Sequence, residues 1–305
     1  MPETKSQPNL TVAESDFPAL YLAADSASRL AQKQHLLFTA TILAALVLSA
    51  ALGTSAGIFH SIGRLLALAS GAGAAVSFIA TSIRRAMRPE KLWYRGRAVA
   101  EAAKSMAWRY MTGADPYPVS LSPAEADGKF IADLKGIAKD QAQALGFGGE
   151  FSDRPQITAR MRELRSAPLE QRRQTYLSSR IEDQRKWYGT KARKSQTVAN
   201  RYFVVIQVSQ ALTLAATVFL LSPMGSKWNV GGVFSALATA LIAWLQVRQH
   251  EELAQTYSVI ALDLGFIEEE GTSVATEKDL SAFVADAEDT LGREHSQWIA
   301  RKTPG

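Results

Sequence analysis

The run LLFTATILAALVLSAALGTSAGIF, residues Leu36–Phe59, decides the fold because it contains no charged side chain. A hydrocarbon layer offers backbone amides no partner, so a helix, which bonds internally, is the natural way for such a run to cross it. At 1.5 Å per residue these 24 residues reach about 36 Å, against a hydrocarbon core of roughly 30 Å. The run therefore predicts a transmembrane helix.

Three more runs repeat this pattern and group the spans into hairpins. After the break His60–Arg64, residues 65–83 are again uncharged. In the second half, uncharged runs over residues 202–221 and 230–247 flank a turn at Ser222–Lys227. We expect an all-α membrane protein with two transmembrane helical hairpins (four spans) and long cytoplasmic helical extensions. Two buried hairpins of a soluble helical bundle are the alternative, to which the Ala- and Gly-rich run 65–83 is most open.

Lysine and arginine cluster at one end of both hairpins. Fifteen of them lie within about 17 residues of the outer span ends, whereas the two turns hold Arg64 and Lys227. The positive-inside bias therefore predicts that both termini and the middle segment are cytoplasmic. A nucleic-acid patch is the competing interpretation of the cations at 84–97. Because cation clusters flank both hairpins, as topology signals would, we expect no nucleic-acid partner.

The composition predicts no enzyme. The chain has no cysteine, which excludes disulfides, a thiol nucleophile and a thiolate metal site. Its four histidines are scattered without ligand spacing. It contains no nucleophile elbow, P-loop or dinucleotide fingerprint. We expect no catalytic residue, metal or cofactor. The polar start Met1–Thr11 lacks the apolar region of a signal peptide, so the first span is expected to act as an uncleaved insertion signal.

Uncharged polar side chains recur inside the spans at helical spacing. Six of them are candidate pore-lining residues: Gln207, Gln210, Thr213 and Thr217 in the third span, with Ser235 and Thr239 in the fourth. Such groups ordinarily bond to neighbouring helices, and lining a water-filled path is the functional alternative. No span contains Asp, Glu, Lys or Arg, which argues against an ion-coupled or proton-coupled carrier.

Small side chains recur in the first hairpin. The candidate helix-packing residues are Gly53, Gly57, Ala67, Gly71 and Ala75. Rows of small residues let helices approach closely, which drives association in lipid. We therefore expect a homo-oligomer, although packing within the hairpin would explain the same spacing.

The order of parts suggests an internal duplication. Each half has a pre-span helix, a two-span hairpin and a long post-span helix. We expect residues 1–17 to be disordered, 18–146 to form a first two-span unit, 147–167 a linker, and 168–300 a second two-span unit with a C-terminal helix. The second and fourth spans are expected to continue as helices into the cytoplasm, the fourth as far as Gly265.

Aromatic and charged residues outside the spans carry a family resemblance. The first hairpin is followed by LWYRGRAVAEAAK at Leu92–Lys104 and WRY at Trp108–Tyr110. The cytoplasmic signature comprises Trp93, Arg97, Glu101, Lys104, Trp108, Trp187, Tyr188 and Trp298. Tyr176, Arg180 and Glu288 support it in the second half. The two halves resemble two subfamilies of SLATT, the SMODS- and SLOG-associating two-transmembrane effector family, so the chain resembles a tandem SLATT protein.

This resemblance implies a function that the residues alone do not. SLATT modules are bacterial, are encoded beside nucleotide-second-messenger synthases or nucleotide sensors, and are thought to form pores in conflict systems. We expect an effector of the bacterial inner membrane that acts in anti-phage defence by abortive infection. Its expected partners are the lipid bilayer, further copies of itself and a separate nucleotide sensor. A membrane-anchored helical scaffold is the alternative, and a small-solute transporter is disfavoured by the uncharged spans.

Overall fold

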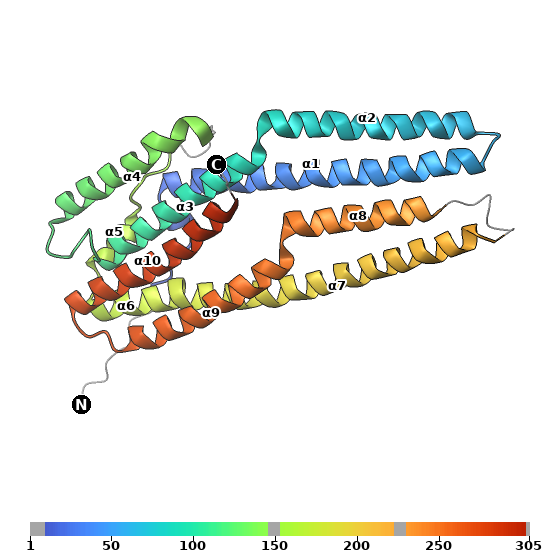
Figure 1. The fold of residues 1–305 in the computed structure, drawn as a ribbon. Helices are drawn as coiled ribbons and strands as arrows, with labels where there is room; N and C mark the ends of the chain where they lie inside the picture. The colour runs from blue at the N-terminus through green and yellow to red at the C-terminus, as the bar shows by residue number, and fades with distance from the viewer. Residues whose placement is uncertain (1–9, 146–152, 223–229, 303–305) are drawn as a thin grey trace. The chain divides into compact units, whose positions relative to one another are not determined.

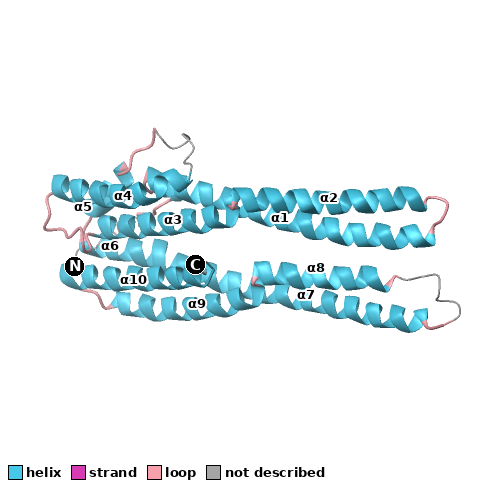
Figure 2. Cartoon of the chain, turned by 45° about the horizontal axis from the view of Figure 1, so that its top comes forward, coloured by secondary structure: helices cyan, strands magenta, loops and turns pink. Residues whose placement is uncertain are grey.

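The structure of the protein, a computed structural model, describes residues 10–145, 153–222 and 230–302, without the side chains at 140–145 and 293–302. Throughout these ranges every regular element is a helix (Figure 1, Figure 2). In chain order these are η1 (Glu14–Asp16), α1 (Ala19–Ile58), α2 (Gly63–Met87), α3 (Pro89–Thr112), α4 (Pro123–Leu145), α5 (Ala159–Ser166), α6 (Leu169–Tyr176), the π-helical segment η3 (Leu177–Glu182), α7 (Asp183–Leu220), α8 (Gly231–Arg248), α9 (His250–Thr272) and α10 (Glu277–Lys302).

Four helical stretches are long and apolar enough to cross a membrane. They are Ala19–Ile58, Gly63–Thr112, Leu169–Leu220 and Gly231–Thr272. The predicted all-α class with four membrane-spanning helices is therefore confirmed. The spans form two antiparallel hairpins, α1 with α2 and α7 with α8 (Figure 1). The predicted turn of the second hairpin, Ser222–Lys227, lies outside the described residues apart from Ser222.

The chain divides into two compact units that both draw on the two halves of the sequence. One, here called the core unit, comprises residues 1–31, 90–189 and 258–305. The other, the span unit, comprises residues 32–89 and 190–257. The two-span units predicted at 18–146 and 168–300 divide the chain by sequence order and not by compactness. That division stays a prediction.

The two helices that enter the hairpins are continuous, whereas the two that leave them are broken. Arg88, between α2 and α3, has φ of 46°, and Gln249, between α8 and α9, has φ of 49°. This left-handed conformation interrupts a helix and is unfavourable for residues other than glycine. The second and fourth spans therefore continue as helices, α3 and α9, as expected, but each continuation is interrupted at a single residue. Pro89 explains the first break, because proline has no backbone N–H to continue the helical hydrogen bonds.

Gly265 does not end the helix after the fourth span, because α9 continues to Thr272. A second glycine of α9, Gly271, lies in close contact with neighbouring side chains. A Cβ atom there would come within 2.4 Å of Leu177 Cδ2 and 2.7 Å of Phe283 Cζ. Glycine thus serves a close helix approach at this position, and the chain turns after it.

The predicted disorder of residues 1–17 is wrong for residues 10–17. Phe17 is 4% exposed, and its ring lies 5.1 Å from that of Tyr21 and 5.8 Å from that of Trp108, centroid to centroid. Burying such a side chain stabilises the folded state by about 1.5–3 kcal/mol, which holds this segment in place. Residues 1–9 lie outside the described residues.

The segment predicted as a linker, 147–167, contributes a helix to the core unit. Met161 and Leu164 of α5 are fully buried. Arg165 donates hydrogen bonds to the carbonyls of Tyr110 and Tyr117, at 3.0 and 2.7 Å. From residue 153 onward, this segment is thus an ordered part of the core unit.

Candidate functional site

The signature residues of both halves meet in the core unit. Trp108 of α3 is 1% exposed. Its ring lies 5.6 Å from the ring of Tyr176, at the end of α6, in an edge-to-face arrangement. Tyr176 in turn contacts Phe283 of α10 at 6.0 Å. An aromatic chain thus links helices that are distant in sequence, and such pairs add about 0.5–1.5 kcal/mol each beyond burial.

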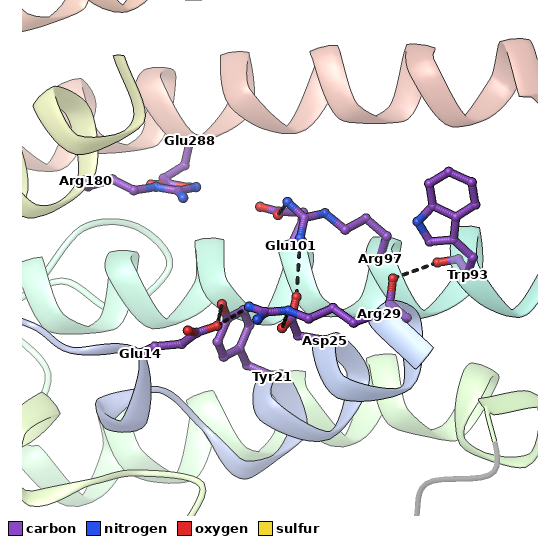
Figure 3. Close-up of polar contacts among 10 residues, drawn as sticks. Glu14, Tyr21, Asp25, Arg29, Trp93, Arg97, Glu101, Arg180 and Glu288 are labelled. Carbon is purple, nitrogen blue, oxygen red and sulfur yellow. Dashed lines mark hydrogen bonds and ion pairs between the residues drawn. The ribbon is translucent and has the colours of Figure 1, made fainter. Parts of the chain in front are cut away.

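A cluster of charged side chains joins α1 and α3 (Figure 3). Arg97 pairs with Asp25 at 3.3 Å and with Glu101 at 2.6 Å. Glu101 therefore pairs with the arginine that precedes it by one turn. Burial raises the pKa of Asp25, whereas Arg29 and Arg97 lower it. Asp25 was not predicted; its signal in the sequence is that it is the only acidic residue in the helical stretch before the first span, residues 18–34.

Lys104 lies over aromatic rings. Its Nζ atom is 5.5 Å from the ring centroid of Phe17 and 5.7 Å from that of Tyr21. Burial lowers the pKa of Lys104, and the neighbouring charge of Arg180 lowers it further. The cation–π contacts favour the charged form in compensation, by roughly 0.5–2 kcal/mol.

A buried ion pair joins the start of the second half to its last helix. Both Nε and Nη2 of Arg180 donate to the Glu288 carboxylate, at 2.8 Å each, and Tyr176 Oη donates to Oε1 at 3.0 Å. The side chains of Arg180 and Glu288 are 3% and 0% exposed. Arg180 lies within the π-helical segment η3.

The remaining signature residues occupy less buried places. Trp93 stacks on Tyr94 at 4.8 Å, and its carbonyl accepts a hydrogen bond from Ser28 Oγ at 3.0 Å. Trp187 is 41% exposed, and its ring meets that of Tyr188 edge-on at 4.9 Å. The side chain of Trp298 lies outside the described residues.

The predicted pore-lining residues lie along α7 and α8, and most of them are exposed. The hydroxyls of Thr213, Thr217 and Thr239 each donate to a carbonyl one turn earlier in their own helix, at 2.9 Å. Ser235 is exposed. Gln207 and Gln210 are exposed as well, and neither bonds to any residue that the structure describes. Among the described residues no hydrogen bond joins the α7 set to the α8 set, so the hairpin does not use these groups to hold its helices together.

The small residues of the first hairpin divide into two groups. A Cβ at Gly53 would lie 3.2 Å from Ser70 Oγ, inside the α1–α2 contact. At Gly57 and Gly71 a Cβ would have nothing within 4 Å, and Ala67 and Ala75 are exposed. The first group packs the hairpin, whereas the second leaves a surface of small residues open.

Two features of this hairpin were not predicted. Gly73 lies against α1, where a Cβ would be 3.3 Å from both the Ala45 carbonyl oxygen and Ser49 Cβ. Ser49 and Ser70 each donate a hydrogen bond to the other's carbonyl oxygen at 2.8 Å. Reciprocal bonds of this kind fix the register of two helices where few other polar groups are present.

Family comparison identifies the two halves. A family model for SMODS and SLOG-associating 2TM effector domain 3 matches residues 18–173, and one for SMODS and SLOG-associating 2TM effector domain 1 matches residues 176–298. The chain is a tandem SLATT protein. No curated protein and no solved structure matches it. As SLATT domains are membrane effector domains associated with conflict systems, the chain is a multi-pass membrane effector in general character.

The two SLATT modules are not independent in the core unit. Arg109 of the first module pairs with Asp289 of the second at 2.6 Å, and it also donates to the Ala285 carbonyl at 3.1 Å. Arg172, almost at the boundary of the two matches, pairs with Glu277 and donates to the Thr112 carbonyl. The tandem protein therefore pairs one SLATT module with another inside a single chain.

The described residues provide helix-packing contacts and an exposed polar helix face. Within the described residues no three His, Cys, Asp or Glu side chains are grouped so that they could hold a metal ion. The buried charges of Arg180 and Glu288 in the core unit are satisfied by each other. The polar surface of α7 belongs to the span unit.

Proposed function

We propose that this tandem SLATT protein assembles with further copies into a pore, or otherwise breaches the membrane, when a separate nucleotide-sensing partner triggers it. The setting is the bacterial inner membrane with both termini in the cytoplasm. The outcome is abortive infection, in which a phage-infected cell is depolarised or lysed. The protein acts without enzymatic chemistry and without a cofactor.

The uncovered polar face of α7 carries this proposal. Gln207 and Gln210 lie in an apolar span, are exposed, and bond to no described residue. Leaving such an amide without partners in hydrocarbon costs several kcal/mol. Water in a channel, or the matching face of another copy, would remove this cost. Both are found in an assembled pore.

Cysteine labelling tests the pore face, because the chain has no cysteine of its own. Single cysteines at Gln207, Gln210 and Thr217 are expected to react with a water-soluble thiol reagent in cells that the protein has depolarised. Cysteines at Val204 and Phe219, which are also exposed but lie elsewhere on the helix, are the matched controls and are expected to stay unlabelled. Depolarisation is followed in the same cells with a potential-sensitive dye.

The outcomes separate the proposal from the scaffold alternative. Absence of labelling at all three positions in depolarised cells would eliminate α7 as the lining. Absence of depolarisation, when the protein and its neighbouring second-messenger synthase are expressed together at normal membrane abundance, would eliminate membrane breach. Gln210→Leu is expected to reduce depolarisation without lowering the amount of protein in the membrane.

A further inference from the structure

A ridge of large apolar side chains on α9 is uncovered. Val259, Leu262 and Phe266 are 55%, 61% and 58% exposed. They follow one another at spacings of three and four residues, so they form one stripe along the helix. The opposite face of α9 holds the buried Ile260 and Leu264. A contiguous exposed apolar surface of this kind marks an interaction site.

Lipid is a poor explanation for the ridge. In α7, Arg185 pairs at 3.0 Å with Glu268 of α9, and it precedes the apolar run that starts at Tyr202 by 17 residues (202 − 185). That is about 25 Å of helix. Two of the residues that flank the ridge, Glu269 and Glu270, are exposed carboxylates. A protein surface is therefore the fitting occupant.

The first SLATT module shows what covers such a face. Ala98 follows the break at Arg88 by ten residues, as Val259 follows Gln249 by ten (98 − 88 and 259 − 249). By the same count Glu101, Ser105 and Arg109 of α3 are the counterparts of three α9 residues: Leu262, Phe266 and Glu270. The two helices also share their buried face, since Val99 and Ala103 correspond to Ile260 and Leu264.

On α3 this face is covered by the second module. Arg109 binds α10 through Asp289 and the Ala285 carbonyl. Glu101 lies close to Arg180 (Figure 3). Burial lowers the pKa of Arg180, whereas the charge of Glu288 and, to a smaller extent, that of Glu101 raise it. The equivalent face of α9, in contrast, is exposed at Val259, Leu262 and Phe266. The two modules are therefore not related by a two-fold axis, because a two-fold contact would cover both faces.

A head-to-tail relation explains this asymmetry. If the contact between modules is repeated, the ridge on α9 should receive the first module of another copy. The counterpart of α10, which follows α9, is α4, which follows α3. The helix α4 lies at the edge of the core unit away from α9, with α3 and α10 between them (Figure 1, Figure 2).

The exposed face of α4 complements the ridge in shape and in charge. Gly128, Ala132 and Gly136 recur every four residues and are exposed, and a Cβ at either glycine would have nothing within 4 Å. This row of small residues can admit large side chains. Lysines border it at three positions: Lys129, Lys135 and Lys139, all exposed and none paired with a described residue. In contrast, α9 carries six Asp or Glu and no Lys or Arg.

We propose that copies of the protein associate head to tail, with the α9 ridge of one copy docked on the small, lysine-bordered face of α4 of the next. A heterologous contact of this kind closes into a ring when its rotation allows. The inference thus names the contact behind the assembly in the proposed function, and it rests on that function for its biological role.

Disulfide trapping in the full-length protein, in mild detergent or nanodiscs, tests the contact. Leu262→Cys protein mixed with Ala132→Cys protein is expected to give a cross-linked dimer on oxidation, whereas neither protein alone does. A mixture of Leu262→Cys with Asp286→Cys, an exposed position on α10, is the matched control. Dimers from Leu262→Cys alone would overturn the proposal, because they would show that the ridge meets its own copy. Absence of any cross-link in the first mixture would also overturn it.

A charge exchange gives an independent readout. Glu269→Lys/Glu270→Lys protein is expected to associate about tenfold more weakly, and so is Lys129→Glu/Lys135→Glu protein, because like charges then oppose each other. Mixing the two variants is expected to restore assembly, since every contact in an alternating array is again complementary. Failure of the mixture to assemble, with both variants folded by circular dichroism, would contradict the charge pairing.

Membrane potential separates this inference from the proposed function. Assembly through α9 and α4 without depolarisation would support the proposed contact and contradict the proposed pore. Undiminished depolarisation by the Glu269→Lys/Glu270→Lys variant would contradict the proposed contact and leave the proposed pore supported.

Discussion

Arg180 and Glu288 each provide the counter-charge that allows the other to be buried. Taking two charges out of water costs several kcal/mol, and their mutual attraction and hydrogen bonds offset that cost. Both side chains are almost fully buried, so neither can turn to solvent if its partner is lost. The pair therefore specifies how η3 and α10 meet more than it adds net stability.

Removing one member of this pair is expected to be more harmful than removing both. Glu288→Gln should lower the free energy of unfolding by about 3–5 kcal/mol, because it leaves the Arg180 charge buried without a counter-charge. Arg180→Met/Glu288→Leu should restore most of that loss. Denaturant unfolding in detergent, followed by tryptophan fluorescence, measures both. A double variant as unstable as Glu288→Gln would contradict this explanation.

Asp25 should make stability depend on pH. Burial raises its pKa above the unfolded value of 3.8, although Arg29 and Arg97 oppose this. The folded state therefore holds the proton more tightly, so the contribution to stability is full below pH 3.8 and is lost as pH rises through the folded pKa. In Asp25→Asn this part of the pH dependence should disappear. Thermal unfolding followed by circular dichroism across the acidic and neutral range compares the two proteins, and identical pH profiles would count against the assignment.

At the scale of single residues, sequence pattern identified participants better than partners. Trp108 and Arg97 belong to the predicted signature, and both take part in the core unit. The ion pair of Arg97 with Asp25 was not foreseen, since it joins two helices that are separated by a whole hairpin.

At the scale of elements, the glycines of the first hairpin should differ in their tolerance of substitution. Gly73→Leu should destabilise the hairpin by about 1–3 kcal/mol, because its side chain would enter the contact with Ala45 and Ser49. Gly71→Leu, two residues away, should have little effect on folding because it points to open space. Thermal stability of the monomeric fraction in detergent measures the difference. Equal destabilisation by both variants would contradict the packing of Gly73 against α1.

The existence of the helices was predictable, and two of their ends were not. Uncharged runs of about 20 residues located the four spans, since only a helix satisfies backbone amides in lipid. The break at Gln249 has no comparable signature, because the residue in the left-handed conformation is not a glycine. Only the break at Arg88 is signalled by the sequence, through Pro89. The continuation of α9 past Gly265 was not predicted, since glycine commonly ends a helix although it also serves close packing.

At the scale of the whole molecule, the order of the helices and hairpins along the chain could be predicted from the sequence, whereas the contacts between distant helices could not. Two hairpins with cations at their outer ends follow from the sequence. The core unit, however, depends on contacts between residues far apart in the chain, such as Arg109 with Asp289. Hydropathy and charge patterns carry no information about such pairs. The helical spacing of its polar residues predicted the polar face of α7, but the sequence could not show that this face is exposed.

The topology can be tested with single cysteines in the otherwise cysteine-free chain. Ser61→Cys, in the turn between α1 and α2, should react with a membrane-impermeant thiol reagent in spheroplasts. Lys129→Cys, an exposed position on α4, should react only after the inner membrane is permeabilised. These results follow from the excess of Lys and Arg at the outer span ends. The reverse pattern would show that the core unit faces outward.

The contrast between unbroken and broken helices has a mechanical consequence. The 40 residues of α1 and the 38 residues that begin at Asp183 in α7 form rods of about 60 Å and 57 Å, each stiff to bending and twisting along its length. The return path in each hairpin is jointed at a single residue, Arg88 or Gln249. Torque applied to the part of each rod that lies in the core unit would travel along the rod, while the joint in the returning helix would absorb the difference in angle.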